Sequence, residues 1–358
     1  MAGALALAFL VPAVALPADA QTRVRYGAEF LASGVGARAL GMGGAFVAHA
    51  NDVTAGYWNV AGLHALSTPE AAYMHAERFD GIVAFDYAAV AVPLSGRSTV
   101  GVSFVRSAVD DIANTLDAFD PATGLPRPGA EDYITYFSAA DNALFVSYAR
   151  EMRRDLAVGA TAKIIRRGVG DLASAWGYSF DVGAQYQIGR VRVGANLQDA
   201  LGMVQAWSVD AERFAQLEEE QRPVGLTEYT LPVLRLGGST AVPVTEQFAL
   251  TAAADVDLGF DGQQANVLDA AGLSFRPRLG AELTYRDILS FRAGIADITA
   301  NEEFGTQITP AMGAGVRLGA LSVDYGFGDF GGLASELGYA HRVSLSYRLA
   351  GTRWDRAE

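Results

Sequence analysis

Eight charged residues lie in segments where polar and apolar residues alternate along the chain. Each of them occupies one of the polar positions. Because both signs are present, they permit two kinds of chemistry: ion pairs that fix internal structure, or a path for a charged solute. We expect internal ion pairs, and Arg38 in a separate glycine-rich segment is a plausible partner for one of the acids. The eight residues are Lys163, Asp181, Arg235, Asp255, Glu282, Arg292, Asp324 and Arg348.

The glycine-rich segment near the N-terminus invites comparison with a nucleotide-binding loop. Its glycines lack the GxGxxG spacing, no hydrophobic strand precedes them, and no Lys-Ser/Thr pair follows. We therefore interpret them as positions where one backbone packs closely against another, inside a plug. The residues assigned to this plug are Gly34, Gly36, Arg38, Gly41, Gly43, Gly44, Asp52, Trp58, Asn59 and Gly62.

Residues suited to catalysis or metal binding are sparse. The chain has no cysteine, which excludes thiolate metal sites, disulfides and cysteine nucleophiles. Its four histidines, His49, His64, His75 and His341, show no metal-ligand spacing on a helix, and no serine lies in a nucleophile-elbow pattern. We expect no metal, no cofactor and no enzymatic activity. The net charge of −13 argues against binding to nucleic acid.

The elements that must position these residues are predicted to be β-strands, because the hydrophobic period is two from about Thr68 onward. Trp176 and Phe180, for example, share one face, and Ser179 and Asp181 share the other. The chain is 51% hydrophobic and 19% charged. Outside the N-terminus, however, no apolar stretch reaches the roughly 20 residues of a spanning helix. Runs of about 10 residues with aromatic ends suit tilted membrane strands.

Counting the alternating runs predicts an all-β membrane barrel of about 14 antiparallel strands. The predicted strands are residues 69–78, 81–93, 98–106, 139–150, 155–167, 174–188, 190–197, 231–241, 246–257, 276–286, 288–297, 308–318, 320–327 and 339–349.

The connections alternate between tight turns and long loops, which is typical of outer-membrane barrels with short periplasmic turns and long outer loops. An even number of strands places both termini in the periplasm. Two outer loops are acidic, which indicates solvated loops or, as a sharper hypothesis, a docking surface for a protein partner. The long connections are residues 107–137, 199–229, 259–275, 299–307 and 328–338.

Four segments are predicted along the chain. Residues 1–20 read as a signal peptide, with Ala18-Asp19-Ala20 matching the small-x-small cleavage pattern. Residues 21–66 form an N-terminal hatch or plug in the lumen, residues 67–350 the transmembrane barrel, and residues 351–358 a periplasmic tail. The predicted location is the cell outer membrane.

Residues 34–63, GVGARALGMGGAFVAHANDVTAGYWNVAGL, resemble the opening of the PorV/PorQ family, and residues 318–349 resemble its closing hairpin. The resemblance implies a FadL-type barrel with an N-terminal hatch. It also implies a role in the type IX secretion of Bacteroidota-like bacteria, where such proteins hold the C-terminal domains of cargo and pass them to the surface attachment machinery. The chain departs from the family at Val60, where proline is usual, and in the tail that follows the last strand.

Two functions follow from these patterns. The resemblance favours a barrel that binds and shuttles secreted cargo, with outer-membrane lipid, cargo proteins and attachment machinery as partners. The alternative is a FadL-like transporter of hydrophobic small molecules. This alternative predicts an apolar pocket in the lumen and a kink or gap in one wall strand. The polar residues predicted to face the lumen argue against it. A barrel lipase would need a Ser–His pair, and His341 has no evident partner in the sequence.

Overall fold

The computed structural model describes residues 21–23, 28–79, 81–120, 123–214, 223–260, 268–270, 273–301, 305–329 and 339–349. The predicted signal peptide and C-terminal tail lie outside these residues. None of the helices in the described part of the chain is long and apolar enough to cross a membrane.

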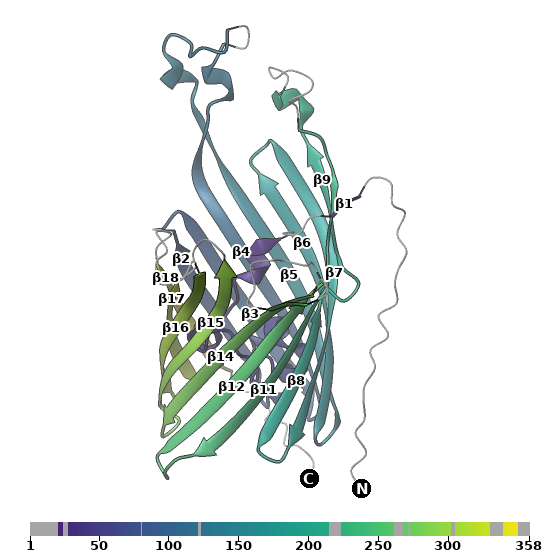
Figure 1. Ribbon diagram of the computed structural model, residues 1–358, viewed down its shortest axis with the longest axis vertical. Helices are drawn as coiled ribbons and strands as arrows, with labels where there is room; N and C mark the ends of the chain where they lie inside the picture. The colour runs from purple at the N-terminus through teal and green to yellow at the C-terminus, as the bar shows by residue number, and fades with distance from the viewer. Residues whose placement is uncertain are drawn as a thin grey trace.

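Within the described residues, fourteen antiparallel strands form a closed ring, as the alternation predicts (Figure 1). The ring closes where β18 pairs with β2, with Val343 opposite His75. Among the fourteen described strands, closure leaves no unpaired strand edge in the lipid. The strands are β2 (Glu70–Arg78), β3 (Val83–Ser95), β4 (Ser98–Asn114), β5 (Thr135–Arg153), β6 (Leu156–Val169), β7 (Ala173–Ile188), β8 (Val191–Gln198), β11 (Val233–Pro243), β12 (Phe248–Gly259), β14 (Leu273–Tyr285), β15 (Leu289–Asn301), β16 (Gly305–Leu318), β17 (Leu321–Asp329) and β18 (Tyr339–Arg348).

The outer wall is apolar and the inner wall is largely polar. On β6 and β7 the outward side chains of Ile164 and Phe180 are 50% and 45% exposed, whereas the inward side chains of Lys163 and Ser179 are buried. A lipid-facing surface needs this alternation, because exposed polar groups have no partner in hydrocarbon.

One end of the barrel, here called the turn end, has tight connections such as residues 96–97, 154–155 and 319–320. The other end, the loop end, has the long connections. Our prediction that residues 107–137 form one loop was wrong, since β4 continues to Asn114 and β5 begins at Thr135. A bulge between Val109 and Ile112, with Asp111 at a φ of 56°, shifts the register there. The bulge breaks the alternation that would otherwise have revealed the longer strands.

The predicted loop 199–229 also contains structure: β9 (Met203–Val209), the 3₁₀ helix η5 (Ala211–Phe214) and β10 (Thr227–Thr230). β8 pairs with the turn-end half of β7 and β9 with its loop-end half, so residues 199–202 interrupt one wall strand. Asp199 has a φ of 53°, and a Cβ on Gly202 would lie 2.2 Å from the Tyr229 ring. Two shorter strands complete the sheet: β1 (Gln21–Arg23), parallel to β10, and β13 (Leu268–Ala270), antiparallel to β14.

Residues 28–66, here called the inner segment, lie inside the ring (Figure 1). Helix α1 packs on β15–β18, while η2 packs on β4–β7 across the lumen, so the segment spans the interior. Its apolar side chains, including Phe46 and Trp58, form the buried core together with inward residues of the wall. Its short helices are η1 (Glu29–Ala32), α1 (Ala37–Gly41), α2 (Ala55–Trp58) and η2 (Val60–Ala65).

Candidate functional site

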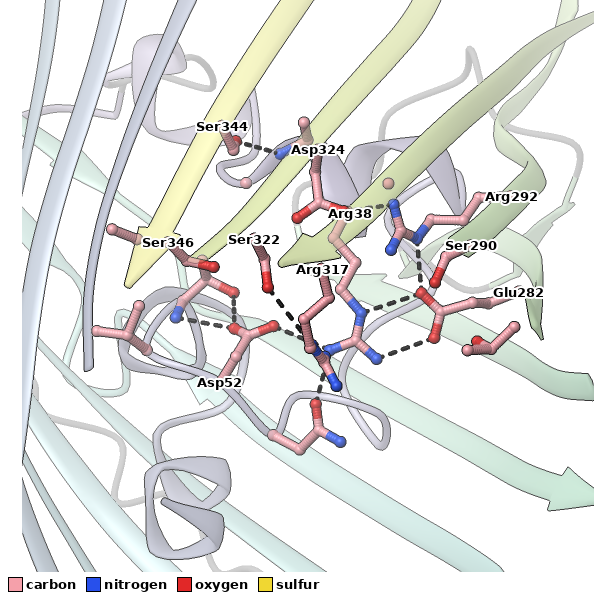
Figure 2. Close-up of a pocket in the computed structure, with 18 of the residues that line it drawn as sticks. Arg38, Asp52, Glu282, Ser290, Arg292, Arg317, Ser322, Asp324, Ser344 and Ser346 are labelled. Atoms are coloured by element: carbon pink, nitrogen blue, oxygen red, sulfur yellow. Dashed lines mark hydrogen bonds and ion pairs between the residues drawn. The ribbon is translucent and has the colours of Figure 1, made fainter. Parts of the chain in front are cut away.

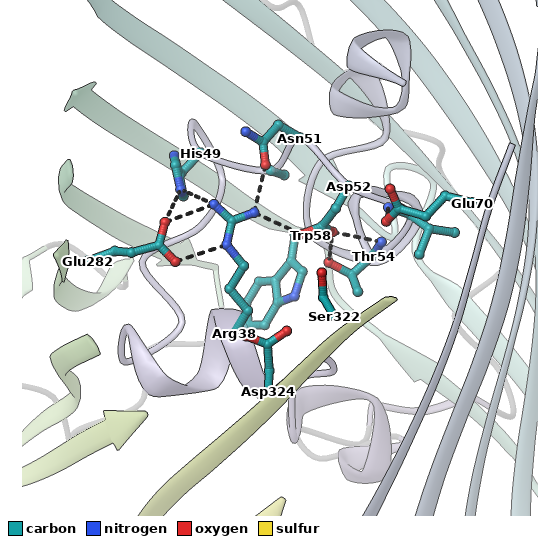
Figure 3. Close-up of polar contacts among 12 residues, drawn as sticks. Arg38, His49, Asn51, Asp52, Thr54, Trp58, Glu70, Glu282, Ser322 and Asp324 are labelled. Carbon is teal, nitrogen blue, oxygen red and sulfur yellow. Dashed lines mark hydrogen bonds and ion pairs between the residues drawn. The ribbon is translucent and has the colours of Figure 1, made fainter. Parts of the chain in front are cut away.

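Arg38 of α1 is the centre of a polar cluster that ties the inner segment to the wall (Figure 3). Its Nη2 and Nε donate to the two carboxylate oxygens of Glu282 on β14, at 3.0 and 3.1 Å. Its Nη1 donates to Asn51 at 2.8 Å and to Asp52 at 3.0 Å. A two-pronged guanidinium–carboxylate contact fixes orientation as well as distance. The geometry therefore fixes α1 at one position on the wall.

The cluster extends along the wall through Arg292 on β15. Arg292 donates through Nε to Glu282 at 2.6 Å and through Nη1 to Asp324 on β17 at 2.7 Å. His49 completes it, with Nε2 lying 2.8 Å from Nη2 of Arg38. Burial and the neighbouring Arg38 charge lower the pKa of His49. A neutral imidazole at neutral pH then accepts a hydrogen bond from Arg38 without adding a further positive charge.

A polar cavity of about 400 Å³ lies at the turn-end side of this cluster (Figure 2). Short hydroxyl side chains and three arginines from β14 to β18 line it. Glu70, also in its lining, accepts from the backbone N–H of Val53 and pairs with Arg348 at 3.4 Å. The hydroxyl and arginine residues are Thr284, Ser290, Ser322, Ser344, Ser346, Arg292, Arg317 and Arg348.

A second buried cluster lies beside the wall interruption. Nζ of Lys163 is 2.7 Å from Asp181 and 2.5 Å from Asp199, and Ser179 also donates to Asp199. Asp181 in turn accepts the backbone N–H of Asp199 at 2.8 Å. These contacts hold Asp199 in its left-handed conformation. The sequence pointed to Lys163 and Asp181 but missed Asp199, because this residue lies outside any alternating run.

A third group of charges lies toward the loop end on β11, β12 and β14. Arg278 donates to Asp257 at 2.8 Å, and Arg235 lies 3.6 Å from the same carboxylate oxygen. Asp255 accepts the backbone N–H of Val47 in the inner segment at 2.8 Å. Asp257 and Arg278 were absent from the predicted site, although they occupy inward positions in register with Arg235 and Asp255.

A larger cavity of about 590 Å³ lies at the loop end, between η1 and the wall. It reaches Asp199 and Met203, on either side of the wall interruption. Apolar and polar residues line it in equal number, and the charged ones are Glu29, Arg78, Asp199, Arg235, Asp257 and Arg276. The apolar residues include Phe30, Leu31, Val83, Met203, Leu231 and Val233.

The remaining plug residues make packing contacts rather than a ligand site. Trp58 donates to the carbonyl of Val35 at 2.9 Å, and Asn59 bonds the carbonyls of Val47 and Ala184. The glycines lie where a side chain would collide: a Cβ on Gly43 would be 2.6 Å from the backbone of Ile295, and one on Gly62 2.2 Å from that of Ala50. The other glycines of this set, Gly34, Gly36, Gly41 and Gly44, have neighbours at 2.6 to 3.2 Å from such a Cβ.

The histidines outside the Arg38 cluster have local partners. His64 lies 2.8 Å from the carbonyl of Ala61, and His75 lies 2.8 Å from Asp86 on the outer wall. Nδ1 of His341 pairs with the phenol of Tyr325 at 2.7 Å, a partner that the sequence did not reveal. This pair involves no serine, so it does not have the composition of a lipase dyad.

The fold defines an outer-membrane β-barrel whose interior is occupied by its own N-terminal segment. No family model matches the chain, and no curated protein matches it in sequence. Solved structures match the fold. The CymD monoaromatic hydrocarbon channel has a TM-score of 0.57 at 16% identity, covering 89% of this chain and 98% of CymD.

Two further solved structures carry the same fold. The Pseudomonas putida toluene transporter TodX has a TM-score of 0.56 at 12% identity, covering 88% of this chain and 97% of TodX. The Ralstonia pickettii toluene transporter TbuX has a TM-score of 0.52 at 14% identity, with 88% and 99% covered. A FadL homologue from Pseudomonas aeruginosa also matches. The chain is therefore similar in fold to FadL-like outer-membrane barrels, among which CymD is described as a channel and TodX and TbuX as transporters.

Proposed function

We propose that this protein carries hydrophobic small molecules across the outer membrane, which was the alternative reading of its sequence. The observation that carries the proposal is the loop-end cavity. Half of its lining residues are apolar, and it meets a wall strand interrupted at residues 199–202. A lumen pocket and a break in one wall strand are the two features that the transport alternative predicts. The described activities of TodX, TbuX and CymD support the same solute class.

In this proposal the loop end faces the outside and the turn end faces the periplasm, with the inner segment as a hatch between them. An apolar solute enters the loop-end cavity, and the Arg38 cluster closes the direct route to the turn-end cavity. The lining of the turn-end cavity is polar, so an apolar solute binds there only weakly.

Filling the loop-end cavity is expected to stop uptake. Ala32 is an exposed residue of η1 in the cavity lining, so Ala32→Trp adds bulk there without disturbing the core. We expect the initial rate of labelled toluene uptake by intact cells that carry the protein in their outer membrane to fall by roughly tenfold or more. Ala162→Trp, on the lipid face of β6, is the matched control and should leave the rate unchanged. Equal rates for cells with and without the protein would refute the proposal.

The cargo-binding reading drawn from the PorV/PorQ resemblance remains a prediction. The hairpin of β4 and β5 rises above the loop end and carries acidic residues such as Glu131 and Asp132, which would suit a protein contact (Figure 1). Purification from the native outer membrane separates the two functions. Co-purified surface proteins that share a C-terminal domain would support cargo binding, whereas bound apolar lipid without such proteins would support transport.

A further inference from the structure

A row of polar side chains faces outward on the neighbouring strands β2 to β6. Its two arginines share the outward face with Phe104 and Ile164, which are 40% and 50% exposed. The row, here called the polar row, consists of five residues that stand opposite one another in the strand pairing: His75, Asp86, Arg106, Asn142 and Arg166. The next outward row toward the turn end carries no charge and consists of Tyr73, Ala88, Phe104, Leu144 and Ile164.

The level of the two arginines on the wall matches the loop-end boundary of the hydrocarbon. Arg106 lies about 27 Å along β4 from its first residue, Ser98, and Arg166 lies about 34 Å along β6 from Leu156. A strand tilt of roughly 40° converts these lengths into depths of about 20 and 26 Å, and the apolar band of such barrels is about 25 Å tall. Trp176, opposite Arg166 with its ring 5.1 Å from the guanidinium, suits the aromatic girdle at this boundary. Both guanidinium groups therefore lie where lipid tails end and headgroups begin.

Positive charge dominates the polar row. Arg106 and Arg166 are partly exposed, and among the described residues neither lies within ion-pair distance of a carboxylate. The single acid of the row, Asp86, stands opposite Arg106 in the pairing. Its carboxylate already accepts from the phenol of Tyr73 at 2.6 Å and lies 2.8 Å from Nδ1 of His75. One engaged carboxylate therefore accompanies two guanidinium groups.

We propose that Arg106, Asn142 and Arg166 bind the phosphate group of a lipid in the outer leaflet. Their strands β4, β5 and β6 are adjacent, so about 10 Å separates the backbones of the two arginines, with Asn142 between them. Long guanidinium side chains can close this gap around one phosphate, whose oxygens match their planar donors. The acyl chains then lie along the uncharged row nearer the turn end. The proposal shares with the proposed transport only the orientation of the barrel, with the loop end outside.

The test measures lipid binding to the purified full chain in an uncharged detergent, titrated by native mass spectrometry. The probes are phosphatidic acid, whose phosphate is a monoester, and phosphatidylcholine, whose phosphate carries choline. We expect phosphatidic acid to bind at least about tenfold more tightly, since each arginine at a membrane surface contributes roughly fivefold. Arg106→Gln and Arg166→Gln should each weaken phosphatidic acid binding by about fivefold. Arg154→Gln, in the exposed turn between β5 and β6, removes the same charge and should leave it unchanged.

Several outcomes would overturn the proposal. Equal affinity for the two lipids, or unchanged affinity for phosphatidic acid in both variants, would do so. An equal loss in Arg154→Gln would also do so, because binding would then follow net charge rather than the polar row. Failure of toluene uptake with intact lipid discrimination would count against transport alone.

The leaflet is tested separately, because the chain has no cysteine of its own. In intact cells a membrane-impermeant maleimide should label Glu131→Cys, at the exposed loop end, and spare Arg154→Cys at the turn end. The reverse pattern would place the polar row in the inner leaflet and contradict the proposed site.

Discussion

Glu282→Gln is expected to release the inner segment from the wall and open the lumen. Glu282 is a buried carboxylate between two guanidinium groups, Arg38 and Arg292. Removing one partner of a buried ion pair costs about 3–5 kcal/mol, because the remaining charges stay desolvated. Even at the lower figure, the ratio of displaced to seated inner segment rises by roughly a hundredfold. The wall itself keeps its strand pairing, so the barrel should survive.

Conductance across a planar bilayer is the direct measurement of this change. The wild-type protein should show rare openings, and Glu282→Gln should show frequent, larger ones that reflect an unblocked lumen. Glu77→Gln is the matched control, since the Glu77 side chain is exposed on the outer face of β2. If Glu282→Gln conducts like the wild type, the Arg38 cluster does not hold the inner segment in place.

The strands of the barrel wall could be predicted from the sequence, because contact with lipid restricts which residues can face outward. Every spanning strand must present apolar residues outward, so the fourteen strands appear as alternating runs. The predictions failed where the backbone leaves regular pairing. At Asp111 a bulge hides the outer parts of β4 and β5. At Asp199 a left-handed residue interrupts a strand, and the remainder, β9, reads as loop.

Less of the candidate site could be predicted from the sequence. Alternation indicates that Glu282 and Arg292 point inward, but it does not identify their partners. Arg38 and Glu282 are separated by 244 positions, and their contact depends on how the inner segment crosses the lumen. That path is set by close packing, such as Gly43 against Ile295, rather than by any periodic pattern. The glycine content therefore indicated close packing but not which strands the segment would meet.

The three charge clusters occupy different parts of the lumen. The Arg38 cluster lies between the inner segment and β14–β17, the Lys163 cluster lies beside the wall interruption, and the Arg235 group faces the loop end. Charges in the first two are largely paired within their own cluster and act as structure, although Asp199 of the second also lines the loop-end cavity. Of the eight charged residues predicted to face the lumen, which were taken as evidence against transport of apolar solutes, Arg235 lines the loop-end cavity and the other seven do not.

Lys163→Met is expected to destabilise the barrel at its interrupted strand. Lys163 is the only lysine in the chain, and its ammonium group lies between Asp181 and Asp199 in a site with almost no solvent exposure. Without it, two buried carboxylates face each other with no cation, at a cost of about 3–5 kcal/mol. The free energy of unfolding in urea, measured in lipid vesicles, should fall by that amount. Hydrogen exchange at residues 199–202 should accelerate.

The matched control replaces the whole cluster with neutral groups. In the triple variant Lys163→Met, Asp181→Asn, Asp199→Asn, no buried charge remains to be desolvated, and most of the lost stability should return. Recovery would show that the single variant suffers from unpaired carboxylates rather than from lost packing volume. A triple variant as unstable as Lys163→Met would instead mean that the ion pairs themselves, with the hydrogen bonds from Ser179 and the Asp199 backbone, hold the wall at this break.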